Sequence, residues 1–295
     1  MRPPLIALAS LTVAVVAASA ALHVTGSSGA AAKSGSASGG AAAKKAAGVK
    51  PFKDVPTLRL PDPLPSRTLH VPILMYHRIA VLQGDEPQVT VGLTVDPGEF
   101  RLQMQWLHEH GYHSISQLQL YQALEQGKPL PPKPFMATFD DGYRNVATIA
   151  APIMRAYGFT GTAYVITDRI VRNAKAAPTW LTWRQLRLLE AGGWDIGSHT
   201  VAHTEIPSLS EADAMQTLRD SRRTLERHLG HPVQWFCYPA GRVDDKSVRW
   251  VAAAGYVLAT TTQEGDTLSA QDPLRLQRVR VANDTGVRGL AAILS

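Results

Sequence analysis

The sequence lacks several features that would otherwise direct its interpretation. It has a single cysteine, Cys237, so no disulfide can form within the chain and no cysteine near the N-terminus can carry a lipid. Residues 1–53 contain no Asp or Glu but six Lys or Arg residues, and the other 24 of the 30 basic residues balance all 24 acidic ones. The pI near 9.5 therefore belongs to the N-terminal segment. Net charge gives no support for nucleic-acid binding by the rest of the chain.

The N-terminal segment is typical of a targeting signal. Leu5 to Leu22 is an apolar stretch after Arg2, and its Ala18-Ser19-Ala20 resembles a cleavage site, so residues 1–22 are predicted to be a signal peptide for export to the periplasm or outside the cell. The same stretch is just long enough to remain as an uncleaved membrane anchor, which leaves membrane association open. Residues 23–50 are mostly Ala, Gly, Ser and Lys and predict a flexible linker, which continues through an extended segment with five prolines up to residue 65.

Residues 66–295 are predicted to form one α/β domain. Strand patterns occur at residues 71–76, 134–139, 162–166, 194–197, 233–238, 256–261 and 276–281. Helix patterns alternate with them at residues 97–110, 116–127, 145–157, 182–190, 210–230 and 244–254. No Gly-x-Gly-x-x-Gly follows a strand and no Walker A sequence is present, which argues against nucleotide binding. Polar residues at the ends of several different strands favour an irregular (β/α)7-type barrel over an open sheet.

A pair of adjacent carboxylates is the most informative feature. Asp140-Asp141-Gly142 follows the apolar run 134–139, and Ser198-His199-Thr200-Val201-Ala202-His203 follows a later strand. One carboxylate and two imidazoles make a ligand set for a catalytic divalent metal, and the other carboxylate remains free to act as a base. Adjacent strand residues face opposite ways, so the chain must twist to aim both carboxylates inward, and Gly142 permits that twist.

The two segments Thr138–Tyr143 and Ser198–His203 resemble the first two motifs of the polysaccharide deacetylases, the NodB-homology domain or carbohydrate esterase family 4. The resemblance covers about residues 70–282. It implies that Asp141, His199 and His203 are metal ligands, that Asp140 is the general base, and that a metal-bound water is the nucleophile. Zn²⁺ is the expected ion, and Ni²⁺, Co²⁺ or Fe²⁺ would suit the same geometry.

The third motif of that family is altered. Where many members have Arg-x-Pro-Tyr-Gly, this chain has Cys237-Tyr238-Pro239-Ala240-Gly241. The Pro and Gly persist, so a backbone N–H near Ala240 could still serve an oxyanion. The Arg that would orient the base is replaced by Cys237, which we interpret as a small buried hydrophobe. Arg278 and Arg280 in the last strand are candidates to replace that Arg, and Arg278 is preferred.

The general acid of the family also needs a substitute. Many members use a His near the C-terminal end, but this chain has no histidine after His231. Val71–Tyr76 followed by His77 resembles the opening strand of the exported poly-N-acetylglucosamine deacetylases, which implies that His77 is the acid. The alternative is that His77 only hydrogen-bonds a loop.

The expected substrate is an N-acetylated polysaccharide, with an exopolysaccharide such as poly-N-acetylglucosamine preferred. Peptidoglycan, chitin-type polymers and O-acetylated xylan remain alternatives, and a carbohydrate-binding protein without catalysis is the rival from another class. Aromatic side chains near the strand ends either stack on sugar rings or pack in the core. These are Tyr143, Trp180, Trp235 and Tyr238. The oligomeric state is not indicated.

Overall fold

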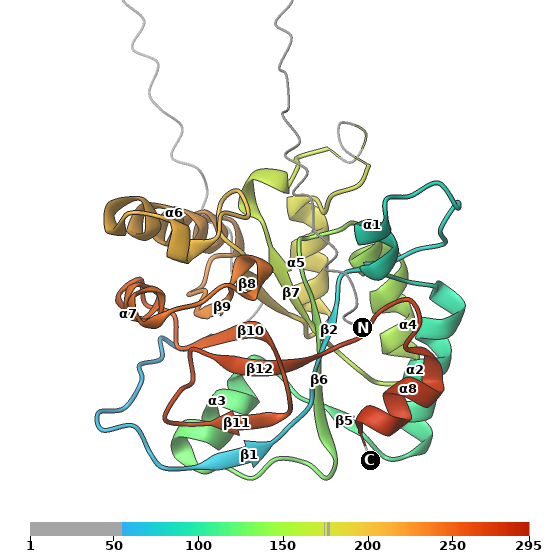
Figure 1. Cartoon of the computed structure of the whole chain (residues 1–295), viewed down its shortest axis with the longest axis horizontal. Coiled ribbons are helices and arrows are strands. Elements are labelled where there is room, and N and C mark those ends of the chain that lie inside the picture. The colour runs from blue at the N-terminus through green and yellow to red at the C-terminus, as the bar shows by residue number, and fades with distance from the viewer. Residues whose placement is uncertain (1–54, 174, 176–177, 295) are drawn as a thin grey trace, which may run out of the picture. The chain divides into compact units, whose positions relative to one another are not determined.

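The computed structural model describes residues 55–173, 175 and 178–294; the predicted signal peptide and the predicted linker up to residue 54 lie outside these residues. Seven parallel strands form a closed barrel, because β2 pairs with both β6 and β12 (Figure 1). In order around the barrel they are β2 (Ile73–Tyr76), β6 (Pro134–Phe139), β7 (Thr162–Val165), β8 (Asp195–Ser198), β9 (Trp235–Cys237), β10 (Leu258–Glu264) and β12 (Leu276–Arg280). The predicted seven-stranded (β/α) barrel is thereby confirmed.

The pleat of β6 determines which side chains enter the barrel. Phe135, Ala137 and Phe139 pack outward in the largest hydrophobic cluster, with residues of the surrounding helices. Met136 packs on the other face with residues from β2, β7, β9, β10 and β12. Thr138 shares that inner face, where its hydroxyl donates to the Leu74 carbonyl. Asp140 continues the same alternation, so it emerges on the inner side of the barrel.

The outer core fixes β2 and β6 against the helices. The rings of Tyr76 and Phe139 stack with centroids 5.3 Å apart, and Phe100 meets Tyr76 edge-on at 5.2 Å. Met104 and Leu107 are also fully buried and share a helical face with Phe100. Each such side chain contributes about 1.5–3 kcal/mol when it is buried. The strand ends that carry the polar residues are therefore held by well-packed neighbours.

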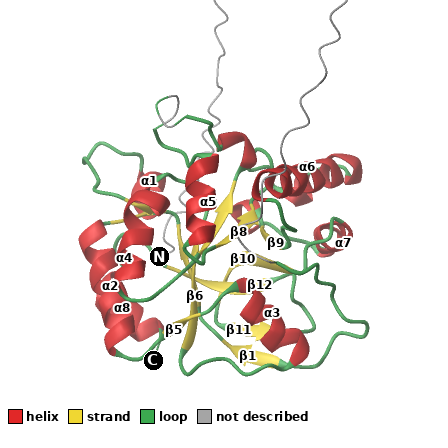
Figure 2. Ribbon diagram, turned by 180° about the vertical axis from the view of Figure 1, so that it is seen from behind, coloured by secondary structure: helices red, strands yellow, loops and turns green. Residues whose placement is uncertain are grey.

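Helices surround the barrel, and α2, α4 and α8 lie on one side of it while α6 and α7 lie on the other (Figures 1 and 2). They are α1 (Gln88–Gly92), α2 (Pro97–Glu109), α3 (Gln117–Gln126), α4 (Ala151–Ala156), α5 (Trp183–Ala191), α6 (Glu211–Leu229), α7 (Asp245–Ala253) and α8 (Gly286–Ile293). Side-chain caps begin several of them. Asp96 accepts from the Gly98 and Glu99 N–H groups, and Ser210 accepts from the Asp213 N–H.

The helix predicted over residues 145–157 is not uniform. Residues Val146–Ala150 form a wider π turn, and only Ala151–Ala156 is α-helical. Pro152 has no N–H to donate in this region, and the wider turn instead binds the Ala151 N–H to the Val146 carbonyl. The expectation of one regular helix was therefore wrong at its first turn.

Short elements that the periodicity did not predict complete the fold. β1 (Thr68–His70) pairs antiparallel with β11 (Thr267–Ser269), and β3 (Arg78–Ile79) pairs with β4 (Thr94–Val95). β5 (His113–Ser114) extends the sheet beside β6. Three 3₁₀ turns are Thr167–Arg169, Ile206–Ser208 and Pro239–Gly241. Two or three residues are too few for a periodic signal.

The predicted boundary at residue 66 lies too late in the chain. Residues 55–65 form no helix or strand, yet they are attached to the domain. The Gln234 amide accepts from the Leu58 N–H at 2.6 Å and donates to the Pro56 carbonyl at 2.9 Å, and the Tyr121 hydroxyl donates to the Arg59 carbonyl. This part of the predicted linker therefore belongs to the folded unit.

None of the helices in the described part of the chain combines the length and apolar character that a membrane crossing requires.

Candidate active site and metal centre

Asp141, His199 and His203 come together at the ends of β6 and β8. Oδ1 of Asp141 lies 3.6 Å from Nε2 of His199 and 3.5 Å from Nε2 of His203. The candidate ligand atoms of the three residues all lie within 4.8 Å of one another. Nδ1 of His199 is 2.7 Å from the Cys237 carbonyl oxygen, so its Nε2 is left to face the carboxylate.

This cluster fits a divalent ion. Oδ1 of Asp141 is buried and has no hydrogen-bond partner within the described chain, although it lies nearest to both imidazoles. A buried carboxylate oxygen without a partner is costly, and a cation between it and the two ring nitrogens would remove that cost. Burial lowers the pKa of His199 to about 4, so its imidazole is neutral and available as a ligand. The donor set is that of a catalytic site with room for further ligands.

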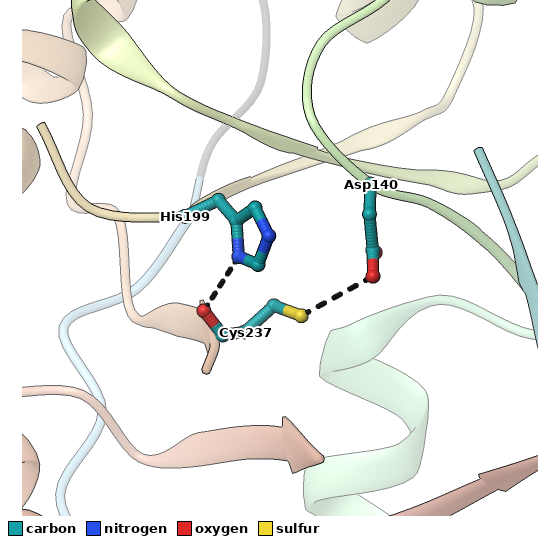
Figure 3. Close-up of side chains that lie close together, drawn as sticks. All are labelled: Asp140, His199 and Cys237. Atoms are coloured by element: carbon teal, nitrogen blue, oxygen red, sulfur yellow. Dashed lines mark hydrogen bonds between the residues drawn. The ribbon is translucent and has the colours of Figure 1, made fainter. Parts of the chain in front are cut away.

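A second group of potential ligands overlaps the first. Asp140, His199 and Cys237 also lie close together, with the Cys237 thiol 3.5 Å from Oδ2 of Asp140 (Figure 3). Burial raises the pKa of the Cys237 thiol well above its ordinary value, which disfavours the thiolate that a metal would bind. Asp140 is already paired with an arginine. The cluster of Asp141, His199 and His203 is therefore the better metal site.

Asp140 is held by Arg278 from β12. Nη1 and Nη2 of Arg278 donate to Oδ1 and Oδ2 of Asp140 at 2.8 and 2.7 Å. Burial raises the pKa of Asp140, but the guanidinium outweighs that effect and keeps the pKa well below its ordinary range. Asp140 is thus a fixed carboxylate beside the candidate metal ligands. Arg280 is exposed, so the preference for Arg278 agrees with the geometry.

Arg278 itself is fully buried and has several partners. Its Nε donates to the Thr261 carbonyl at 2.7 Å, and Nη1 donates to the Thr138 hydroxyl at 3.1 Å. Nη2 lies 3.2 Å from the sulfur of Cys237. The sequence analysis did not anticipate the part played by Thr138. Its position two residues before Asp140, on the same face of β6, was the available signal.

His77 follows β2 and lies beside the same carboxylate. Its Nε2 is 3.8 Å from Oδ2 of Asp140, and 13 % of its side chain is exposed. Burial lowers the pKa of His77, and the nearby carboxylates Asp140 and Asp141 oppose that effect. His77 therefore lies beside the predicted base, with a small part of its side chain open to solvent.

Backbone strain is concentrated around the site. The described chain has five non-glycine residues with positive φ, and Asp141 (74°), Thr200 (67°), His203 (63°) and Ala240 (53°) are four of them. The predicted twist after Asp140 thus falls on Asp141 itself as well as on Gly142, whose φ is 84°. The left-handed conformation of Asp141 is what lets two adjacent carboxylates face the same side.

The third-motif loop keeps a special conformation despite its altered sequence. Ala240 is exposed, and the next residue, Gly241, has a φ of 67°. A Cβ on Gly241 would lie 2.6 Å from the backbone nitrogen of Thr262, so only glycine fits there. The loop is therefore fixed by its contact with β10. The oxyanion role of Ala240 stays a prediction.

The predicted substrate contact of Tyr238 is wrong, and for Trp235 the structure shows core packing, one of the two alternatives. Tyr238 is fully buried, its ring meets that of Phe236 edge-on, and it belongs to the same hydrophobic cluster as Tyr256. Trp235 is 3 % exposed and belongs to the core inside the barrel. Their strand positions point these side chains into packed layers, away from the site opening. Tyr143 and Trp180 are only partly buried, and their rings stack with centroids 4.9 Å apart.

Comparisons with known proteins agree with this geometry. The model of the protein family described as polysaccharide deacetylase matches residues 127–259. The chain is 30 % identical over 212 residues to YxkH of Bacillus subtilis (strain 168), named as a polysaccharide deacetylase, and the match covers 72 % of this chain and 71 % of that protein. It is 25 % identical to a poly-β-1,6-N-acetyl-D-glucosamine N-deacetylase of Staphylococcus epidermidis, over 72 % of this chain and 78 % of that one.

A solved structure shares the architecture. The Streptococcus pyogenes deacetylase PplD, in complex with acetate, superposes with a TM-score of 0.70 and 29 % sequence identity. The match covers 78 % of this chain and all of that chain.

Proposed function

Because the chain belongs to the polysaccharide deacetylase family, we propose that it removes N-acetyl groups from a β-linked polymer of N-acetylglucosamine. The family makes it a hydrolase of carbon–nitrogen bonds other than peptide bonds. The observation that carries the proposal is the juxtaposition of the cluster Asp141, His199 and His203 with the Asp140–Arg278 pair. The likeness to the Staphylococcus epidermidis enzyme supports the choice of polymer.

The reaction adds water to the acetyl carbonyl carbon and breaks the bond from that carbon to nitrogen, which releases acetate and a free amine. Asp140 accepts the proton of the attacking water, and Arg278 keeps this carboxylate charged and aimed. Asp141, His199 and His203 would hold a divalent ion, which would supply Lewis-acid chemistry to the reaction. The backbone N–H of Ala240 is our candidate for a further donor to that oxygen.

His77 completes the proton balance. The leaving nitrogen needs a proton. Nε2 of His77 lies 3.8 Å from Oδ2 of Asp140, beyond direct hydrogen-bond distance, so the proton taken from water passes to the imidazole through a bridging water. His77 then delivers that proton to the nitrogen as its bond to the acetyl carbon breaks. The absence of any histidine after His231 makes His77 the acid we assign.

We further propose Zn²⁺ as the resident ion and a location outside the cytoplasm. One carboxylate and two imidazoles suit Zn²⁺, although Ni²⁺, Co²⁺ and Fe²⁺ accept the same ligands. Export is supported by the apolar stretch Leu5–Leu22 and the small residues at its end.

Acetate release from defined polymers tests the proposed substrate. The purified protein, supplied with Zn²⁺, is incubated with poly-β-1,6-N-acetylglucosamine, chitin oligomers, peptidoglycan and O-acetylated xylan, each with and without a chelator. We expect chelator-sensitive acetate release that is fastest with poly-β-1,6-N-acetylglucosamine. Faster release from peptidoglycan or xylan would contradict the proposed substrate, and sugar binding without release from any polymer would indicate a carbohydrate-binding protein instead.

A further inference from the structure

A cleft of about 500 Å³ opens beside the metal centre and has no role in the mechanism above. It is lined by Arg78, Tyr143, Arg144, Asn145, Thr148, Pro178 and Thr179. Two of the lining residues are close in sequence to residues of the active site. Arg78 directly follows His77, and Tyr143 lies two residues after Asp141. A polymer bound with one sugar at the metal centre would therefore place a neighbouring sugar at this cleft.

The walls of the cleft are fixed by contacts between two loops. The Arg144 N–H donates to the Thr179 carbonyl at 2.8 Å, and the Leu181 N–H donates to the Gly142 carbonyl at 3.0 Å. Tyr143 and Trp180 form a β-bridge between the same loops, and their rings stack. The loop after Asp141 and the loop around Trp180 thus form one connected unit beside the ligands.

Three arginines surround this unit, and we refer to Arg78, Arg144 and Arg169 as the arginine wall. The guanidinium carbon of Arg78 lies 5.4 Å from the centre of the Tyr143 ring, and that of Arg169 lies 4.5 Å from the Trp180 ring. Arg144 lines the cleft itself. All three arginines are partly buried. Arg78 and Arg144 line the cleft where a sugar would bind, and Arg169 lies against the adjoining Trp180 ring.

The charge of the arginine wall is not neutralised within the described part of the chain. The ion pairs and side-chain hydrogen bonds found there include none made by these three guanidinium groups. Nε of Arg78 is buried without a partner. Glu86 interacts electrostatically with Arg78, but neither Glu86 nor the exposed Asp168 lies within ion-pair distance of the three guanidinium groups. The cleft is therefore electropositive.

From this charge we infer that the arginine wall makes the cleft reject a sugar that has already been deacetylated. This inference rests on the proposed function, because the product of that reaction carries an ammonium group. A neutral N-acetylated neighbour meets no repulsion, whereas an ammonium group within the screening length of about 8 Å is repelled by three guanidinium groups. The enzyme therefore avoids sites next to its own products and spaces free amines along the polymer.

Three oligosaccharides that differ at one position test the role of the wall. Each carries a single N-acetylated target sugar, and its neighbour bears at C2 an N-acetyl group, a hydroxyl group or a free amine, placed on each side of the target in turn. At pH 6 and low salt we expect kcat/KM for the amine to be about tenfold below that for the hydroxyl on one side of the target. The neutral hydroxyl separates the effect of charge from the loss of the acetyl group.

Variants and salt identify the source of the discrimination. Replacing Arg144→Gln together with Arg169→Gln should bring the amine-to-hydroxyl ratio of kcat/KM closer to one, with Arg78 left as the remaining positive charge, and 1 M salt should reduce the discrimination of the unaltered protein. The matched control is Arg155→Gln, an exposed arginine on α4 outside this cleft, which should leave the ratio unchanged. Melting curves check that each variant is folded.

Equal kcat/KM for the amine and the hydroxyl on both sides would overturn the role of the wall while the proposed function stands. An unchanged ratio in the double variant would also overturn it. Failure to hydrolyse even the fully acetylated oligosaccharide would contradict the proposed function and remove the basis for this inference.

Discussion

Arg278 of β12 binds both oxygens of Asp140 at 2.7–2.8 Å, although the two residues are separated by 138 positions in the sequence. The contact lies inside the barrel, where Arg278 has no solvent exposure. A two-point contact of this kind fixes both the charge and the orientation of the carboxylate. It brings to the site a guanidinium that the third-motif loop, with Cys237 in place of Arg, does not provide.

Replacing Arg278→Lys should reduce kcat strongly while leaving the metal site intact. Lysine keeps the positive charge but cannot bind both oxygens of Asp140, so the base loses its fixed orientation. We expect kcat to fall by about 10²-fold, within the range for impaired general-base catalysis. Replacing Arg278→Met leaves the buried carboxylate without its partner, which should cost about 3–5 kcal/mol in the free energy of unfolding. Steady-state kinetics and denaturant unfolding measure the two effects.

The matched control is Arg280→Lys, because Arg280 lies two residues further along β12 and is exposed. It should change kcat and the free energy of unfolding very little. If Arg278→Lys retained full turnover, Arg278 would be a structural residue only.

Replacing His77→Ala should impair amide hydrolysis far more than hydrolysis of an activated ester. An amine leaving group must be protonated, whereas a phenolate-type leaving group departs without a proton. We expect a loss of about 10²–10⁴-fold for N-acetylated oligosaccharide and less than about tenfold for an activated acetyl ester. Equal losses on both substrates, or no loss on either, would show that His77 is not the acid.

Glu125 in α3 should make the folded protein less stable as pH rises. Only 8 % of the surface of Glu125 is exposed to solvent, and neither of its carboxylate oxygens has a hydrogen-bond partner in the described chain. Burial raises its pKa to about 7 from an ordinary value of 4.5, and Arg67 only partly opposes this. The folded state therefore holds the proton more tightly than the unfolded state, and the resulting stability is present below pH 4.5 and lost as pH rises through 7.

Replacing Glu125→Gln should remove this pH dependence. Between pH 5 and pH 8 the difference in stability should amount to about 1 kcal/mol after solvent screening, or roughly 2–4 °C in Tm. Melting curves of the unaltered protein and of Glu125→Gln across this range measure it, with the exposed Glu109→Gln on α2 as the control. A Tm difference that stayed constant with pH would show that Glu125 titrates normally.

The sequence predicted the barrel well because its main signals are local. The apolar run at 134–139, the caps at Asp96 and Ser210, and the glycine after α6 each act within a few residues. The proximity of Asp141, His199 and His203 was predictable because the resemblance assigned each of them to a motif as a candidate metal ligand. The order of these motifs placed the ligands at strand ends, which meet at one end of a parallel barrel.

Other features depend on contacts that no local pattern contains. The two-residue strands β3 and β4 exist only as partners of each other, and the attachment of residues 55–60 depends on Gln234, which lies far away in the sequence. Tyr238 looked available to a sugar because it ends the predicted strand 233–238, but its side chain turns into the core between β9 and its helices. Orientation at a strand end depends on local φ and ψ, which the residue types there did not reveal.

The metal content of the purified protein and two variants tests the central claim most directly. After reconstitution with Zn²⁺ and removal of excess ion, we expect about one ion per chain in the unaltered protein and in Asp140→Asn, and almost none in Asp141→Asn. Acetate release should be lost in both variants, because one lacks the base and the other lacks the ion. A full complement of Zn²⁺ in Asp141→Asn, or undiminished acetate release by metal-free protein, would contradict the account.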